Sequence, residues 1–209
     1  MPAPGHLQTC VLRSDSLAYP ATGLRIARLA QVRSHFLQFA DYNKWANARL
    51  YEAAFALPDS EYRRDVGAFF GSLHGTLNHL LLTDRIWLRR LTGDGEHPDQ
   101  LDAILCEHLA TLALARVDED ERILRYVRSL PETELRGLQV YSTTSGKSFE
   151  QRRCDILAHL FNHQTHHRGQ AHAILSIVTG CEPPPLDLLA MQRGITAPDL
   201  RTVASRAIT

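Results

Sequence analysis

The chain has 209 residues, of which 44% are hydrophobic, and this is enough to bury one core without a second domain. Lysine and arginine together number 23, as do aspartate and glutamate, so no excess charge attracts the chain to nucleic acid or to an anionic membrane. Its apolar residues form short periodic runs, never the run of about 18 that a membrane-spanning helix needs. We therefore expect a soluble protein with no nucleic-acid partner and no membrane partner.

Residues 1–23 are expected to form a flexible N-terminal tail. They contain Pro2, Pro4 and Gly5 among scattered polar residues, and they lack the basic start and continuous apolar segment of a secretory signal. The four cysteines are far apart and include no CxxC pair, so we expect reduced thiols in a cytoplasmic protein. Residues 24–209 are expected to fold as one domain. The cysteines are Cys10, Cys106, Cys154 and Cys181.

Two helices are predicted in the first half of the chain. From Leu24 to Leu57 the apolar residues recur every three to four positions, and Pro58 ends the run. A second run with the same period extends from Asp65 to Leu91 and stops before a glycine-rich turn. Both periods indicate amphipathic helices.

A third helix and a small hairpin are predicted next. Pro98 opens a helical run that Pro131 closes. The polarity of residues 138–141 then alternates, and a turn-like stretch around Gly146 follows. We therefore expect a small hairpin at this point.

The fourth helix is predicted from Phe149 to Thr179, with Gly180 as its C-terminal stop. A short segment around residues 186–191 follows three prolines. Four long amphipathic segments with mostly short connections predict an all-α protein, a four-helix bundle.

Five histidines gather in the fourth predicted helix: His159, His163, His166, His167 and His172. On a helical wheel, His163 and His167 fall inside the apolar arc, whereas His159 and His166 lie at its edge and His172 points away. Two core-facing imidazoles four residues apart allow one helix to provide two ligands to one metal ion. A tight site needs a third ligand.

The second predicted helix offers that ligand in His74 or His79, and the wheel does not choose between them. Three strings of residues then resemble a known family. They are YNKWAN at residues 42–47, the stretch from His74 to Trp87, and HLFNHQTHHRGQ at residues 159–170. With these strings, about residues 30–192 resemble the DinB family of DinB/YfiT-like metalloenzymes.

The resemblance implies a DinB/YfiT-like four-helix bundle, often a homodimer, that holds a divalent metal ion such as zinc or nickel through three histidines. Carried over to this sequence, the ligands are His79, which lies five residues before Asp84, together with His163 and His167. Three imidazoles leave a coordination position open, which is typical of a catalytic site. No residue is assigned a catalytic role.

We interpret the chain as a metal-dependent enzyme of the thiol-dependent transferase type, because some relatives in the wider superfamily use a low-molecular-weight thiol. Its partner would be a small-molecule substrate of that class. The alternative is a non-catalytic, stress-related metal- or ligand-binding protein. The alternative is supported by the lack of an HExxH motif and of any Asp or Glu between Asp155 and Glu182, which leaves no evident general base.

Other polar and aromatic residues near the site keep two interpretations. Asp84 is expected either to hold the second ring nitrogen of a ligand or to pair with an arginine such as Arg85 or Arg168. Arg168 is expected either to bind an anionic substrate or to form an exposed ion pair. Trp45 and Trp87 are interpreted as core anchors. The remaining histidines, expected to support the ligands or to lie at the surface, are His74, His159 and His166.

Overall fold

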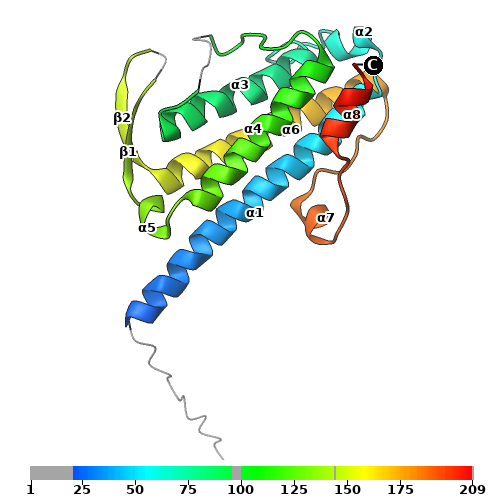
Figure 1. The fold of residues 1–209 in the computed structure, drawn as a ribbon. Helices are drawn as coiled ribbons and strands as arrows, with labels where there is room; N and C mark the ends of the chain where they lie inside the picture. The colour runs from blue at the N-terminus through cyan, green and yellow to red at the C-terminus, as the bar shows by residue number, and fades with distance from the viewer. Residues whose placement is uncertain (1–20, 96–99, 144, 209) are drawn as a thin grey trace, which may run out of the picture.

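Four long helices form the body of the protein. The computed structural model describes residues 21–95, 100–143 and 145–208, with side chains from residue 31 onward. The long helices run side by side (Figure 1), and α1 and α3 each contact both α4 and α6. The predicted all-α four-helix bundle is therefore confirmed. The four helices are α1 (Ala21–Phe55), α3 (Leu73–Thr92), α4 (Leu109–Ser129) and α6 (Arg153–Thr179).

The expected N-terminal tail lies mostly outside the described residues, which begin at residue 21. Residues 21–23 belong to α1, so the first helix starts slightly earlier than predicted. Two short helices lie between the long ones, α2 (Asp59–Arg63) and α5 (Glu132–Leu135), and two follow them, α7 (Leu188–Gln192) and α8 (Leu200–Arg206). The sequence pattern did not predict α8, which packs against α4.

The predicted hairpin is present between α5 and α6. Strands β1 (Leu138–Ser142) and β2 (Ser148–Arg152) pair antiparallel, with Leu138 opposite Arg152 and Ser142 opposite Ser148. The fourth helix begins at Arg153 and not at Phe149, because residues 149–152 are part of β2. The hairpin projects beside the bundle (Figure 1) and exposes several apolar side chains.

The second long helix, α3, starts later in the sequence than predicted. Residues 65–72 form an irregular loop because Gly67 and Gly71 adopt left-handed backbone conformations, with φ of 74° and 71°. The helix begins after Ser72, whose side chain accepts a hydrogen bond from the Gly75 amide.

The third helix also starts later than predicted, at Leu109. Residues 100–108, just before it, are not helical. Their backbone is tied instead to α3, since the amides of Leu105 and Cys106 donate to the Asn78 side-chain oxygen, each at 2.9 Å.

The core has two large apolar parts, one toward each end of the bundle, and a smaller third part around Trp45 and Ala190. One large part contains Leu50, Leu77 and Leu175, and the other contains Phe36, Leu88 and Leu157. On each of the four long helices, buried polar residues lie between these two parts in sequence, so a polar layer crosses the bundle. Its members are Asn43, Asn47, Asp84, Arg116, Asp120, Gln164 and Arg168.

The polar layer is held by ion pairs and hydrogen bonds that join all four helices. Arg116 contacts Asp84 at 2.7 Å and Asp120 at 3.0 Å. Asn43 donates to Asp120 at 3.0 Å and accepts a hydrogen bond from Arg168. Two arginines and two aspartates balance in charge, as buried ions require.

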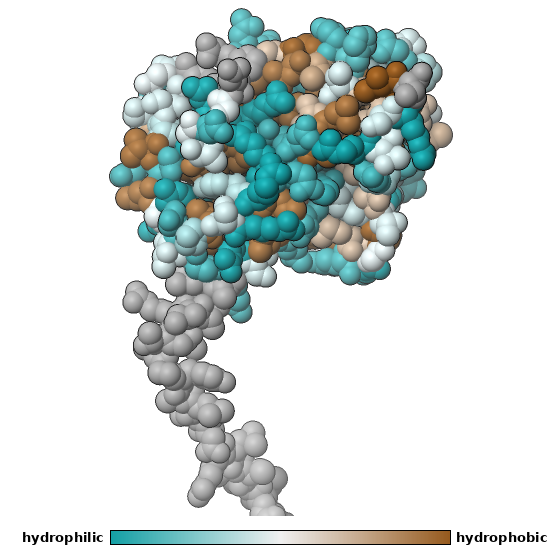
Figure 2. Space-filling view, viewed as in Figure 1, coloured by the Kyte–Doolittle hydropathy of each residue, from teal (hydrophilic) through white to brown (hydrophobic). Residues whose placement is uncertain are grey.

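The molecular surface carries hydrophilic side chains over much of the face in Figure 2, with apolar patches between them, one of which lies at the edge where Figure 1 places the hairpin. Within the described ranges, no helix combines the length and the apolar character needed to cross a membrane.

Candidate metal centre

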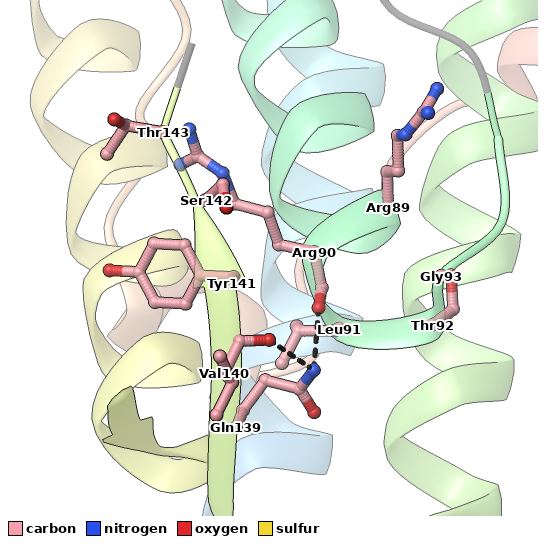
Figure 3. Close-up of a pocket in the computed structure, with 10 residues that line it drawn as sticks. All are labelled: Arg89, Arg90, Leu91, Thr92, Gly93, Gln139, Val140, Tyr141, Ser142 and Thr143. Carbon is pink, nitrogen blue, oxygen red and sulfur yellow. Dashed lines mark hydrogen bonds between the residues drawn. The ribbon is translucent and has the colours of Figure 1, made fainter. Parts of the chain in front are cut away.

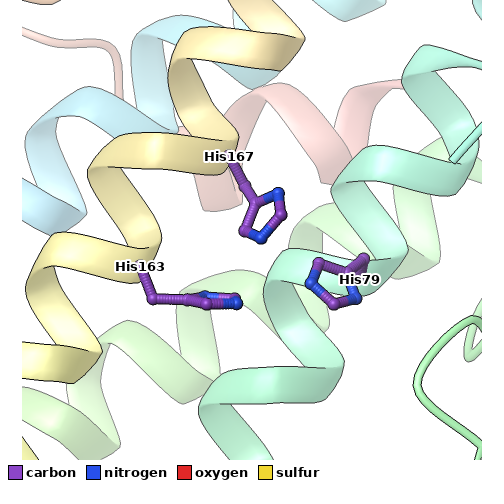
Figure 4. A group of neighbouring side chains, drawn as sticks. All are labelled: His79, His163 and His167. Carbon is purple, nitrogen blue, oxygen red and sulfur yellow. The ribbon is translucent and has the colours of Figure 1, made fainter. Parts of the chain in front are cut away.

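Three histidines from two helices lie together at one side of the bundle. His79 lies in the second turn of α3, and His163 and His167 lie one turn apart on α6 (Figure 4). Each can offer one ring nitrogen, and these three nitrogens lie within 4.8 Å of one another. His79 and His167 are buried, and His163 is partly buried. The structure thus brings together all three predicted ligand residues.

Hydrogen bonds fix the proton position on two of the three rings. The Nδ1 of His79 lies 2.8 Å from the Leu101 carbonyl oxygen, and the Nδ1 of His167 lies 2.7 Å from the Gln170 side-chain oxygen. These oxygens only accept hydrogen bonds, so each Nδ1 carries the proton and each Nε2 keeps its lone pair. The Nε2 of His79 is buried and has no hydrogen-bond partner among the described residues. A buried acceptor of this kind fits a metal ligand.

Burial keeps the three imidazoles neutral. It lowers the pKa of His79 to about 4, against the opposing hydrogen bond to Leu101. Burial and the neighbouring histidines lower the pKa of His163 to about 3. Burial also lowers the pKa of His167. All three are therefore uncharged at neutral pH, which is the form that binds a metal ion.

The donor set fits a divalent ion with an open position. A triangle of nitrogens with sides of at most 4.8 Å has a point within about 2.8 Å of all three corners, so shifts of about 1 Å or less would reach the usual zinc–nitrogen distance. Three imidazoles from the protein match the ligand count of catalytic sites, since closed structural sites use four. The described members of this cluster include no carboxylate and no thiol.

The aromatic ring of Phe70 covers the site, which the sequence did not predict. It stacks on His79 with ring centroids 3.8 Å apart and meets His167 edge-on at 5.5 Å. The loop that carries Phe70 can approach α3 because residue 75 is glycine: a Cβ there would lie 2.2 Å from the Phe70 carbonyl oxygen. The only sequence signal was the pair of glycines, Gly71 and Gly75, around Ser72.

Asp84 does not support a histidine. It pairs with an arginine, as its second interpretation expected, but the arginine is Arg116 and neither Arg85 nor Arg168, and both side chains of the pair are fully buried. Arg168 is not exposed either: it is 2% exposed and bonds to Asn43 and Gln164. It is thus part of the polar layer and is not available to a substrate. The two interpretations of Arg168 from the sequence were both wrong.

The remaining histidines take different positions. His74 is buried, and its Nε2 lies 3.1 Å from the Cys106 carbonyl oxygen. His159 and His166 are exposed, and His166 contacts Gln170, the partner of His167.

The two tryptophans also differ from each other. Trp45 is a core residue whose Nε1 donates to the Ile195 carbonyl oxygen at 2.7 Å, as its interpretation as an anchor requires. Trp87 is only partly buried and packs against Tyr141 and His159.

Comparisons with known proteins agree with this architecture. The family model for the DinB family matches residues 31–199, which include all three histidines of the site. The chain is also similar to Protein DinB of Bacillus subtilis (strain 168), with 29% identity over 144 residues that cover 65% of this chain and 81% of the relative. The chain therefore belongs to the DinB family.

Proposed function

We propose that the chain is a metal-dependent enzyme of the thiol-dependent transferase type, in which His79, His163 and His167 hold a divalent ion. The observation that carries this proposal is the buried Nε2 of His79, which has no hydrogen-bond partner among the described residues and lies beside two further neutral imidazoles. A bound ion would supply a positive charge that lowers the pKa of a thiol placed in the open position.

A thiol suits this site better than a hydrolytic reaction does. Hydrolysis by a metalloprotease uses a carboxylate as general base beside the ion. Here Asp84 is paired with Arg116 in the polar layer, and the described histidine cluster contains no carboxylate. A thiol needs less help, because its ordinary pKa of about 8.5 is already close to neutral pH. The residues present therefore favour a substrate that is its own nucleophile.

The protein groups around the histidines give the site order and partial enclosure. The Leu101 carbonyl and the Gln170 side chain orient two rings, and Phe70 excludes water from one side. Zinc and nickel are the proposed ions because imidazole nitrogen suits both, and neither thiolate nor carboxylate is present in the cluster.

A second candidate function is non-catalytic binding of a metal ion or ligand. The observation that favours it is the same lack of a carboxylate, together with the close cover of Phe70 over His79. The two functions differ in whether an added thiol reaches the ion and is consumed.

Elemental analysis of the untagged protein tests the metal site first. We expect about one zinc or nickel ion per chain in the parent and little in the His79→Ala and His163→Ala variants. The matched control is His108→Gln, which removes an exposed histidine outside the site and should leave the metal content unchanged. Equal metal content in all four proteins, or none in the parent after reconstitution, would overturn the site.

The choice between the two functions needs a second measurement. Cobalt-loaded protein should change its visible and near-ultraviolet absorption when a low-molecular-weight thiol is added, and an electrophile should then consume that thiol catalytically. An unchanged spectrum, or binding without turnover across a panel of electrophiles, would favour the non-catalytic function.

A further inference from the structure

Arg90 lies on the same side of α3 as His79. The two residues are 11 positions apart, which is close to three full turns, so their side chains project in similar directions. At 1.5 Å per residue the separation along the helix axis is about 16 Å. The long arginine side chain reaches back toward the site, since its Cζ lies 4.4 Å from the ring centroid of Trp87, almost one turn earlier.

Two aromatic rings hold the guanidinium of Arg90. Its Cζ lies over Trp87 of α3 and, at 5.2 Å, over Tyr141 of β1. Figure 3 shows the side chain crossing from α3 toward Ser142 at the end of β1 and Thr143 just after it. Stacking of this kind uses the flat faces of the guanidinium and leaves its N–H edge free for a planar anion.

No described residue forms a hydrogen bond or an ion pair with the side chain of Arg90. The neighbouring arginines of α3 are engaged: Arg85 pairs with Glu119 at 3.7 Å, and Arg89 donates to the Gly95 carbonyl oxygen at 2.8 Å. Arg89 thus binds a carbonyl oxygen just beyond the C-terminal end of the helix, where a cation is ordinarily favourable. Arg90 turns away from that end, and its partial burial, which lowers its pKa, is not offset by a carboxylate.

A continuous row of rings joins Arg90 to the histidine site. Trp87 lies 4.8 Å from His159, and His159 lies 5.8 Å from His163, all measured between ring centroids. His159 is close enough to Arg90 for their charges to interact: burial lowers the pKa of His159, and the positive charge of Arg90 lowers it further. At the far end, Arg90, Tyr141 and Thr143 help to line a pocket of about 560 Å³ (Figure 3).

We propose that Arg90 binds the carboxylate of a substrate whose thiol end reaches His79, His163 and His167. This inference rests on the proposed function and specifies its substrate class: a thiol that also carries a carboxylate, with the two groups on the order of 10 Å apart along the direction of α3. The rings of Trp87 and Tyr141 position the guanidinium, and its N–H edge supplies two parallel hydrogen bonds to the carboxylate oxygens.

The test titrates cobalt-loaded protein with matched pairs of thiols and follows the cobalt absorption. Mercaptooctanoate is long enough to reach Arg90, and mercaptooctanol is its uncharged match. Mercaptoacetate and mercaptoethanol form a short pair that cannot reach. We expect mercaptooctanoate to bind about tenfold more tightly than mercaptooctanol, since a hydrogen-bonded charge contributes on this scale. The short pair should show no such preference.

Variants assign the preference to Arg90. Arg90→Met keeps an apolar stem against Trp87 and should lose the preference for mercaptooctanoate. Arg89→Met removes the adjacent arginine, which points to the other side of α3 in Figure 3, and should keep it. Matching cobalt spectra before thiol is added show that the variants are folded and loaded. A preference that survives in Arg90→Met would overturn the proposal.

A second measurement separates this proposal from the proposed function. Octanoate and octanamide are added to metal-free protein, and the Nε resonance of Arg90 is followed by NMR. Octanoate should shift this resonance at a concentration about tenfold below that of octanamide. If no thiol changes the cobalt spectrum, the thiol function fails, and octanoate still decides whether Arg90 binds carboxylates. Equal effects of octanoate and octanamide would overturn the role of Arg90.

Discussion

Arg116 of α4 and Asp84 of α3 form an ion pair with a 2.7 Å contact between Nη1 and Oδ2, and both side chains are shielded from solvent. The pair lies in the polar layer that crosses the bundle. Its charges are balanced by Asp120 and Arg168 on α4 and α6. Buried charges of this kind are costly unless every partner is in place.

Asp84→Ala should therefore destabilise the protein strongly. The substitution leaves the Arg116 guanidinium buried with one carboxylate fewer, and the free energy of unfolding should fall by about 3 kcal/mol or more. Urea unfolding measures it. Arg201→Ala is the control, because its contact with Asp118 is shorter, at 2.6 Å, but exposed, and its loss should change the free energy of unfolding far less than the loss of Asp84. Similar losses for both variants would contradict the importance of burial.

The metal-free protein should depend on pH through His79. Its pKa is lowered to about 4 in the folded state, mainly by burial, so the unfolded chain takes up a proton between pH 6.5 and 4 that the folded chain does not. The contribution of His79 to the free energy of unfolding is thus fully present above pH 6.5 and falls as the pH drops from 6.5 to 4. Burial of Asp84 raises its pKa to about 7 and contributes with the opposite sign, so a comparison with His79→Gln is needed.

The quantity to measure is the difference in the free energy of unfolding between the parent and His79→Gln. The parent should become less stable relative to His79→Gln as the pH falls from 6.5 to 4. The reason is that His79 takes up a proton in the unfolded parent, whereas burial disfavours this proton in the folded parent. A difference that is constant over this range would show that His79 titrates normally in the folded protein.

Gln170→Leu should weaken metal binding without removing a ligand. The Gln170 oxygen accepts a hydrogen bond from Nδ1 of His167 and so holds its Nε2 toward the site. Loss of such a partner costs about 10- to 100-fold in metal affinity. Competition with a coloured chelator measures the change. Gln38→Leu, an exposed glutamine on α1, should have the affinity of the parent.

Phe70→Ala should expose the site to water. Removal of the stacked ring reduces the burial of His79, so the pKa of His79 should rise toward its ordinary value, and stability should fall by about 1–2 kcal/mol. NMR titration of the His79 ring follows the pKa. Phe69→Ala is the matched control: Phe69 is 86% exposed, and its loss should change stability by less than about 0.5 kcal/mol. An unchanged pKa of His79 in Phe70→Ala would contradict the covering role.

The pattern of apolar residues was sufficient to predict the four long helices and the hairpin. It failed where local backbone geometry decides the structure. Gly67 and Gly71 adopt left-handed conformations that end any helix, although Phe69 and Phe70 keep the helical period. Residues 100–108 carry apolar side chains at a helical spacing, but Asn78 binds their backbone amides. A side chain more than twenty residues away in sequence gives no local signal.

The candidate site likewise contains residues that the local pattern could predict and residues that it could not. His163 and His167 followed from their places on one helix, whereas the choice of His79 over His74 required the family resemblance. The structure shows why the pattern could not choose: both are buried on α3, but His74 packs against Tyr62 and the Cys106 carbonyl. The Leu101 carbonyl could not be predicted, because backbone atoms are present at every residue. Arginine is ordinarily a surface residue, and only the ion-pair partners of Arg116 in the structure explain why it is buried.

The order of residues along α6 couples the histidine site to the polar layer. His163 is followed directly by Gln164, and His167 by Arg168; the histidines face the site, while Gln164 and Arg168 enter the polar layer, where Gln164 donates to the Leu80 carbonyl oxygen. Rotation or sliding of α6 by one residue would separate the imidazoles and, in the same movement, leave two buried polar groups without partners. Misassembled bundles are therefore penalised twice, which widens the free-energy gap between the native packing and its competitors even before an ion is present.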